Sequence, residues 1–382
     1  MSLTSPTLLV ILAVLAGLVP IVVALLWRKL PGGAGGFVLR LVAIVLCQVL
    51  AVGAIGLWAN NQFGFYNTWG DIIGEPEAGG DADADGGEAP DPDADPGAPL
   101  TTINTDDLVP DDGSKGTLTT FPVTVPGEKG SEAVSVEVMA WMPKQYADPA
   151  NKDTKFPVLM MLPGQPSKPE TLFDNFDFST AATDAIDSGK VAPFVAVFPP
   201  LMIAPPRDTE CTDIKNGPQA ETWLNKTVPD AVQGKLRVDD PGPTWSLFGF
   251  STGAFCAAKL LLRNPDTFGA AVSVGGYYDA LTDDTTGDLF KGDKKMENEN
   301  SPRWLVDQNR DKQTNLMIVV SAKDESSYTP GKPYANSKQM IETCKGVPGV
   351  TSIVVPSGGH HYDTYINTVP ETLEWLNKVA KL

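Results

Sequence analysis

The stretch Trp245–Leu262, which reads WSLFGFSTGAFCAAKLLL, contains the turn that decides the fold. Residues 245–249 form a short, mainly apolar run typical of a buried strand, and residues 252–263 have the pattern of a helix. Between them, Gly249–Gly253 matches G-x-S-x-G, in which the glycines permit a turn too crowded for a Cβ. The sequence therefore predicts a strand, a sharp turn and a helix, with the Ser251 hydroxyl at the top of the sheet and at the positive end of the helix.

Short apolar runs alternate with helical patterns over residues 115–382. The predicted strands are 134–143, 156–162, 194–199, 245–249, 271–275, 316–321 and 351–355. The predicted helices are 176–188, 220–233, 252–263, 334–344 and 370–380. This alternation implies an α/β fold, in which a mostly parallel sheet carries helices on both faces and binds ligands at the carboxyl ends of its strands.

The Ser251 pattern alone also fits a glycine-rich turn in which the serine caps a helix. A nucleophilic serine needs a base, and His360 and His361, the two histidines of the chain, follow the predicted strand 351–355. It also needs an acid to orient that base, and Asp324 and Glu325 follow the strand 316–321. The order serine, acid, histidine is that of the α/β-hydrolase arrangement, so these features together favour a catalytic serine.

Three segments resemble the putative-esterase branch of the α/β-hydrolases, which includes esterase-D-like enzymes, feruloyl esterases and mycolyltransferases. They are the strand-then-glycine segment Met160–Gln165, the turn Gly249–Gly253, and Gly358-Gly359-His360 with the spaced aromatics Tyr362 and Tyr365. The resemblance spans most of residues 120–380, implies the α/β-hydrolase fold, and makes His360 the base and His361 a spacer. The pattern Thr209–Thr212 further resembles secreted, membrane-anchored actinobacterial esterases of this branch.

Two departures set the chain apart from the mycolyltransferases of that branch. Their oxyanion loop contains an arginine in an Asp-Gly-x-Arg-Ala type pattern, whereas Pro163–Ser167 has none. Their elbow has a bulky methionine after the serine, whereas this chain has Thr252. The resemblance therefore does not extend to trehalose or mycolate specificity.

The resemblance implies a serine esterase or acyltransferase that needs no cofactor. Ser251 attacks an ester carbonyl, His360 takes its proton and Asp324, with Glu325 as the alternative acid, orients His360. The backbone N–H groups of Thr252 and Gln165 stabilise the oxyanion, and the acyl group then passes to water or to an alcohol. Expected partners are acyl esters, including glycolipids and glycans of the cell envelope. The alternative is a catalytically silent hydrolase-fold module that binds envelope glycans, lipids or a protein partner; the oligomeric state stays open.

Residues 1–70 predict a membrane anchor of two helices, spanning about 7–27 and 37–59. The first run has no positive segment before it and is too long for a signal peptide, and a second run follows it directly. Lys29 and its neighbour Arg28 lie in the connecting loop 28–36, so the positive-inside rule places this loop in the cytoplasm. The N-terminus and the C-terminal domain are then extracellular.

The net charge of -18 arises from 29 Lys and Arg against 47 Asp and Glu, which disfavours a nucleic-acid binder. Residues 71–114 contain no basic residue and are rich in Asp, Ala, Gly and Pro, which predicts a disordered linker between the anchor and the domain 115–382. Asp81–Gly86 imitates the start of a calcium loop, but Pro92 stands where the loop needs Glu. With two His and four Cys, no metal site is expected.

The cysteines of the outer domain face an oxidising compartment in this topology. Cys256 lies on the helix after Ser251, and Cys211 lies on the loop after the predicted strand 194–199, which we expect to neighbour the strand 245–249. We therefore expect a Cys211–Cys256 disulfide with Cys344 free; three buried free thiols are the alternative. Residues 279–310 are polar and are expected to be a solvated surface excursion, with a substrate-selecting lid as the alternative.

Overall fold

The computed structural model describes residues 6–63, 103–106, 108–127, 134–204, 207–283, 285–324 and 333–382. The chain forms two compact units, Met1–Asp81 and Ala82–Leu382. We describe each unit by itself.

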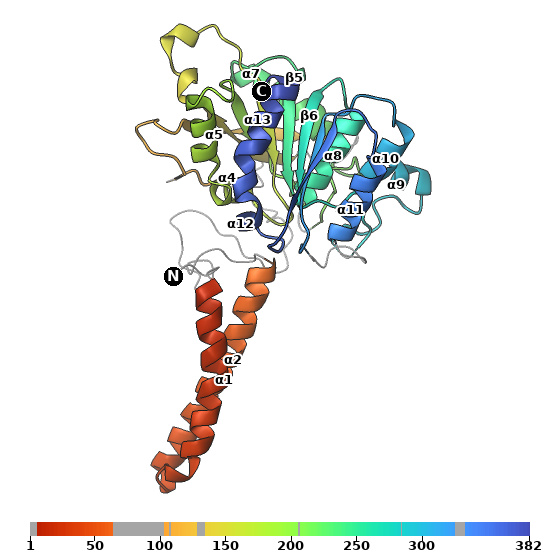
Figure 1. Cartoon of the computed structure of the whole chain (residues 1–382). Helices are drawn as coiled ribbons and strands as arrows, with labels where there is room; N and C mark the ends of the chain where they lie inside the picture. Colours follow the sequence, from red (N-terminus) through yellow and green to blue (C-terminus); the bar gives the residue numbers. More distant parts are fainter. Residues whose placement is uncertain are drawn as a thin grey trace. The chain divides into compact units, whose positions relative to one another are not determined.

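The first unit is a pair of helices, α1 (Pro6–Leu26) and α2 (Gly33–Phe63), which lie side by side in Figure 1. By length and composition, Leu8–Leu26 and Gly35–Trp58 are long and apolar enough to cross a membrane, a test that a signal sequence would also pass. Most of their large apolar side chains are exposed. The two windows nearly coincide with the predicted spans, because both rest on the same uninterrupted apolar runs.

The second unit is built on one sheet. Within the described residues it has eight strands: β1 (Thr117–Val125), β2 (Val134–Met142), β3 (Val158–Leu162), β4 (Val195–Phe198), β5 (Gly242–Phe250), β6 (Phe268–Val274), β7 (Leu316–Ser321) and β8 (Val350–Val355). Their order is β1-β2-β4-β3-β5-β6-β7-β8, so β4 lies between β2 and β3 and does not neighbour β5, contrary to the prediction for the strand 194–199. The pairs β1–β2 and β2–β4 are antiparallel and the other pairs are parallel, so the mostly parallel sheet is confirmed.

Helices cover both faces of this sheet. Figure 1 shows α4 (Pro169–Asn175), α5 (Phe178–Asp187) and α13 (Val369–Ala380) on one side, with α8 (Thr252–Arg263), α10 (Pro302–Gln308) and α11 (Pro333–Thr343) on the other. The shorter helices are α6 (Ala220–Thr222), continued by a π-helical turn (Trp223–Thr227) into α7 (Val228–Lys235), together with α9 (Lys294–Glu299) and α12 (Tyr362–Tyr365). The α/β-hydrolase architecture predicted from the sequence is confirmed.

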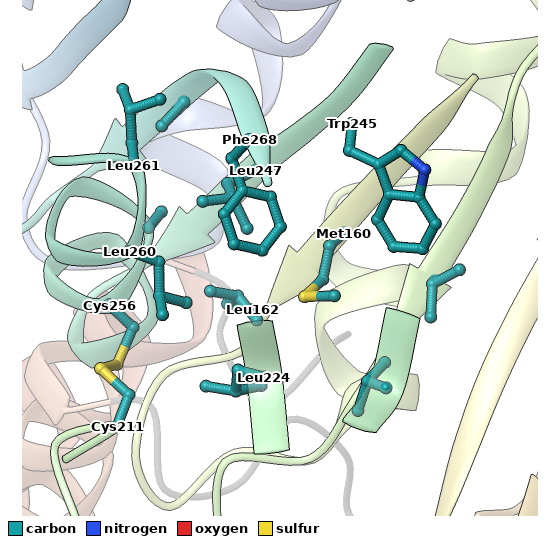
Figure 2. Close-up of a cluster of buried hydrophobic side chains, with 14 of the residues drawn as sticks. Met160, Leu162, Cys211, Leu224, Trp245, Leu247, Cys256, Leu260, Leu261 and Phe268 are labelled. Carbon is teal, nitrogen blue, oxygen red and sulfur yellow. A yellow bond between two sulfur atoms is a disulfide. The ribbon is translucent and has the colours of Figure 1, made fainter. Parts of the chain in front are cut away.

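The strands bury both of their faces, because successive side chains point to opposite sides of a sheet. On β3, Met160 and Leu162 join the cluster that packs against α8, while Leu159 and Met161 join the cluster that packs against α5 and α13. All four side chains are at most 1% exposed. Figure 2 shows Met160 and Leu162 beside Leu260 of α8. The uninterrupted apolar run that predicted this strand is thus explained by burial on both faces.

Three elements differ from the sequence prediction. Strand β1 was not predicted, because Pro122 and the alternation of polar residues suit an edge strand, which has a weaker apolar signal. Residues 279–310 are not wholly a solvated excursion, because α10 buries Leu305 and Val306. Ile103, expected within the linker, is 6% exposed and its N–H donates to Glu137 at 2.9 Å, so the chain already lies against the domain there.

Candidate active site

The turn between β5 and α8 has the geometry that its sequence predicts. Ser251 adopts φ 57° and ψ −119°, a backbone conformation that residues other than glycine rarely adopt. A Cβ on Gly249 would collide with the backbone of Gly253, and a Cβ on Gly253 would collide with the carbonyl groups of Leu162 and Pro163. Both glycines are therefore required by close backbone approach, and the turn presents Ser251 at the carboxyl end of β5.

The structure brings Ser251, His360 and Asp324 into one hydrogen-bonded row. His360 Nε2 lies 2.8 Å from Ser251 Oγ, and His360 Nδ1 lies 2.8 Å from Asp324 Oδ2. The three residues follow β5, β8 and β7, whose carboxyl ends meet at one edge of the sheet. Asp324 is fully buried and Ser251 is 9% exposed, so water screens these contacts only weakly. Glu325, the alternative acid, lies outside the described residues.

Tyr365 supports the carboxylate of this row. Its hydroxyl donates to Asp324 Oδ2 at 2.7 Å and accepts from the N–H of Ser321 at 3.1 Å. Burial, together with the charge of Asp324, raises the pKa of Tyr365, so its hydroxyl stays protonated and able to donate. In the sequence Tyr365 is recognisable only as one of the spaced aromatics after His360, which predicts no contact with Asp324. Its spacing alone does not reveal a partner 41 positions away.

The ring of His360 stacks on that of Phe250, the last residue of β5, with centroids 4.9 Å apart and an interplanar angle of 24°. This contact and the hydrogen bond to Asp324 together restrict the rotation of the imidazole. Burial lowers the pKa of the neighbouring His361, and the proximity of His360 lowers it further. Within the described part of the chain, the imidazole hydrogen-bonded to Ser251 is that of His360 and not that of His361, so the geometry singles out His360 of the two histidines.

The loop after β3 passes directly beside Ser251. A Cβ built on Gly164 would lie 3.0 Å from Ser251 Cβ, which is tighter than ordinary contacts. Gln165 is the residue that follows Gly164 in this loop. Thr252 is the first residue of α8, so its N–H lacks a partner within the helix. Of the two residues expected to bind an oxyanion, Thr252 directly follows Ser251, and Gln165 follows Gly164, which lies against Ser251.

A disulfide joins Cys211 to Cys256 across a Cα–Cα distance of 5.9 Å, and Cys344 is free and buried. Figure 2 shows this bridge at the edge of the core cluster beside α8. Among the residues that the structure describes, no three His, Cys, Asp or Glu side chains gather in a way that could hold a metal ion.

Comparison with known proteins gives a match to one protein family. The family model described as "Putative esterase" matches residues 133–376, which hold all three residues of the row. An uncharacterized protein of Corynebacterium glutamicum is 22% identical over 275 residues, which are 70% of this chain and 63% of that protein. The chain thus spans less than two thirds of the length of that relative.

Solved structures of similar fold are esterases and other serine hydrolases. A ferulic acid esterase has 16% identity and a TM-score of 0.56 over 69% of this chain and 98% of its own. An S-formylglutathione hydrolase from Agrobacterium tumefaciens has 14% identity and a TM-score of 0.56, over 70% and 96%. The fluorophosphonate-binding serine hydrolase F of Staphylococcus aureus has 16% identity and a TM-score of 0.54, over 68% and 98%. At these identities the likeness shows the fold.

Proposed function

Since this chain belongs to the putative esterase family, we propose that it is a serine esterase or acyltransferase with Ser251, His360 and Asp324 as its catalytic triad. The observation that carries the proposal is the pair of 2.8 Å contacts that join the serine, imidazole and carboxylate in a row. A glycine-rich turn with a capping serine requires neither the imidazole nor the buried carboxylate. The distances therefore favour a catalytic serine over the cap.

The first half of the reaction follows from this row. His360 Nε2 accepts the Ser251 proton as Oγ attacks the carbonyl carbon of an acyl ester. The Nδ1–H of His360 points to Asp324 Oδ2, so the carboxylate selects the tautomer that leaves Nε2 free to accept. Its negative charge also stabilises the imidazolium. When the tetrahedral intermediate collapses, His360 returns the proton to the departing alcohol and Ser251 keeps the acyl group.

The oxyanion of that intermediate needs two donors near Ser251. The backbone N–H groups of Thr252 and Gln165 fill this role in our proposal, because one begins α8 and the other follows Gly164, which lies against the serine. In the second half of the reaction His360 deprotonates an acceptor hydroxyl. Water gives hydrolysis, and a sugar or lipid hydroxyl gives acyl transfer.

We further propose that α1 and α2 anchor the enzyme in a membrane. The supporting facts are two apolar helices with exposed apolar side chains and the cations Lys29 and Arg40 near their connection. The positive-inside rule then puts that connection in the cytoplasm and the esterase domain outside, where glycolipids or other acyl esters of the cell envelope are within reach.

Labelling with a fluorophosphonate probe tests the triad. We expect the full chain to be labelled at Ser251 and to hydrolyse a p-nitrophenyl acyl ester, and Ser251→Ala to lose both. Ser246→Ala is the matched control, because Ser246 is a buried serine on β5, the strand that leads to Ser251, and its hydroxyl has no partner among the described residues. A chain that folds but takes no label would be the silent binding module instead.

A further inference from the structure

A buried segment, Asp208–Thr212, packs against α8 and is organised around Glu210. The carbonyl oxygen of Glu210 accepts from the ammonium of Lys259, a residue of α8, at 2.7 Å. Its carboxylate oxygen Oε1 accepts from the hydroxyl of Tyr277 at 2.5 Å, and Oε2 accepts from the N–H of Leu281 at 3.0 Å. Glu210 is 1% exposed and Lys259 is 0% exposed, so these bonds form away from water.

The backbone around Glu210 is strained. Glu210 and Cys211 have φ values of 44° and 48°, in the left-handed region that side-chain-bearing residues disfavour. Such conformations persist where the surrounding structure over-determines them, and they concentrate at functional sites. Here the constraints come from α8, through the Cys211–Cys256 disulfide and the contact of Lys259 with the Glu210 carbonyl. The Glu210 side chain is thus held in a single direction.

The Glu210 side chain points toward Tyr277, which lies beside Thr252, the residue after the proposed nucleophile. Tyr277, which follows β6, stacks on Phe255 of α8 with ring centroids 4.9 Å apart and planes 17° apart. Its hydroxyl donates to Glu210, and the Thr252 side chain lies beside the same hydroxyl, whose pKa it lowers. Glu210 and Tyr277 therefore brace the first turns of α8, through Lys259 and Phe255 and beside Thr252.

We infer that Glu210 and Tyr277 are positioning residues that hold Thr252, and with it the oxyanion-binding N–H, in place at the start of α8. This inference rests on the proposed function. The Thr252 N–H has no partner within the helix, so only the placement of its own residue decides where it points. An error of about 1 Å in such a group can cost roughly 100-fold in rate. Neither Glu210 nor Tyr277 is required to touch the substrate.

The bond between Glu210 and Tyr277 forms in either protonation state of Glu210. Burial, with the charge of Asp208, raises the pKa of Glu210 to about 8, while Tyr277 and Lys259 favour the charged form. A carboxylate accepts from the Tyr277 hydroxyl, and a protonated Glu210 can donate to it. In both cases Tyr277 stays fixed beside Thr252, so the inference does not depend on which form prevails.

Two neighbouring tyrosines offer a matched pair of variants in the full-length protein. Tyr277→Phe keeps the ring that stacks on Phe255 and removes the hydroxyl between Thr252 and Glu210. Tyr278→Phe removes an equally buried hydroxyl, which instead lies 2.9 Å from Ser273 Oγ. The readouts are kcat and KM for a p-nitrophenyl ester, the thermal midpoint, and the affinity for an arylboronic acid, whose tetrahedral adduct carries negative charge at the oxyanion position.

We expect Tyr277→Phe to lower kcat roughly tenfold or more while KM changes little, and to weaken boronate binding by a similar factor. Tyr278→Phe should keep kcat and boronate affinity close to wild type even where its thermal midpoint falls as far. Glu210→Gln, which can still accept from Tyr277, should retain more activity than Glu210→Ala.

The outcomes separate this inference from the proposed function. If the wild type is labelled by a fluorophosphonate at Ser251 but Tyr277→Phe and Tyr278→Phe have equal kcat, the positioning role is wrong and the triad stands. If losses in kcat merely follow losses in thermal midpoint across all four variants, the network is only structural and the inference is again overturned. If the wild type takes no label, the triad is wrong and this inference falls with it.

Discussion

Asp324 is the residue at which a change of one functional group tests the proposed mechanism most finely. As a carboxylate it accepts from both His360 Nδ1 and the Tyr365 hydroxyl through the same oxygen. In Asp324→Asn, an amide NH₂ can take the place of that oxygen and favour the tautomer of His360 that has its proton on Nε2. Nε2 then cannot accept from Ser251. We expect kcat to fall roughly 10³- to 10⁴-fold with little loss of fold.

The matched control is Asp363→Asn, which removes an exposed carboxylate from α12, three residues after His360, and leaves Ser251, His360 and Asp324 unchanged. Steady-state kinetics and circular dichroism on both variants check the prediction. Activity of Asp324→Asn within tenfold of wild type would assign the orienting role to another carboxylate, with Glu325 as the first to examine.

Sequence reasoning reached Ser251, Asp324 and His360 because each is a chemically distinctive residue just after a recognisable strand. It did not reach the contacts of Tyr365 or Glu210. These form over separations of 41 and 67 residues, between side chains that occur in any protein core. Their partners are decided by how loops pack on the sheet, and no local pattern encodes that packing.

At the scale of elements, most of the parallel sheet was predictable because buried parallel strands are continuous apolar runs. The boundaries of the helices were harder to predict. The predicted helix 176–188 in fact begins at Phe178, after Asp177 takes a left-handed φ of 43° that separates α4 from α5. Helix α4 itself was missed because Pro169–Asn175 is short and only its buried residues Leu172 and Phe173 mark it as helical.

The attachment of the Asp208–Thr212 segment to α8 predicts a measurable contribution to stability. The Cys211–Cys256 bridge closes a separation of 45 residues, for which chain entropy alone gives about 4 kcal/mol. We expect the double variant Cys211→Ser, Cys256→Ser to lose about 2–4 kcal/mol of unfolding free energy in chemical denaturation. Cys344→Ser is the control, since it removes a buried free thiol and leaves the bridge intact. Equal stability of the double variant and the wild type would contradict this prediction.

Alkylation of the cysteines tests for the same disulfide without any mutation. Burial raises the pKa of the Cys344 thiol to about 12, so at pH 8 very little of it is the reactive thiolate. We expect iodoacetamide at pH 8, without reductant, to leave Cys211, Cys256 and Cys344 of the folded domain unmodified. After denaturation it should modify Cys344 alone of these three. Modification of Cys211 or Cys256 under either condition, measured by peptide mass spectrometry, would mean that the bridge is absent.

At the scale of the whole molecule, the proposed anchor would decide where the enzyme meets its substrate. Helices α1 and α2 expose a largely apolar surface, which water disfavours and hydrocarbon accepts. We expect the full-length protein to remain in the membrane fraction after alkaline carbonate extraction. A single cysteine introduced at Gly33, in a background without Cys47, should react with an impermeant maleimide only from the cytoplasmic side.

Three results would contradict this topology. Release by carbonate would show that the helices do not span the bilayer. Labelling of the cysteine at position 33 from outside intact cells would reverse the proposed orientation. Cleavage after the first apolar run, seen as a shortened N-terminus, would instead identify that run as a signal sequence.

The central claim is that Ser251 carries the acyl group during turnover. Rapid mixing of the full chain with a p-nitrophenyl acyl ester, followed by acid quenching and peptide mass spectrometry, measures this directly. We predict an acyl adduct on the peptide that contains Ser251, formed in step with a burst of p-nitrophenol and absent from His360→Ala at the same time points. Hydrolysis at the wild-type rate with no adduct on Ser251, or with an adduct on another residue, would contradict the account.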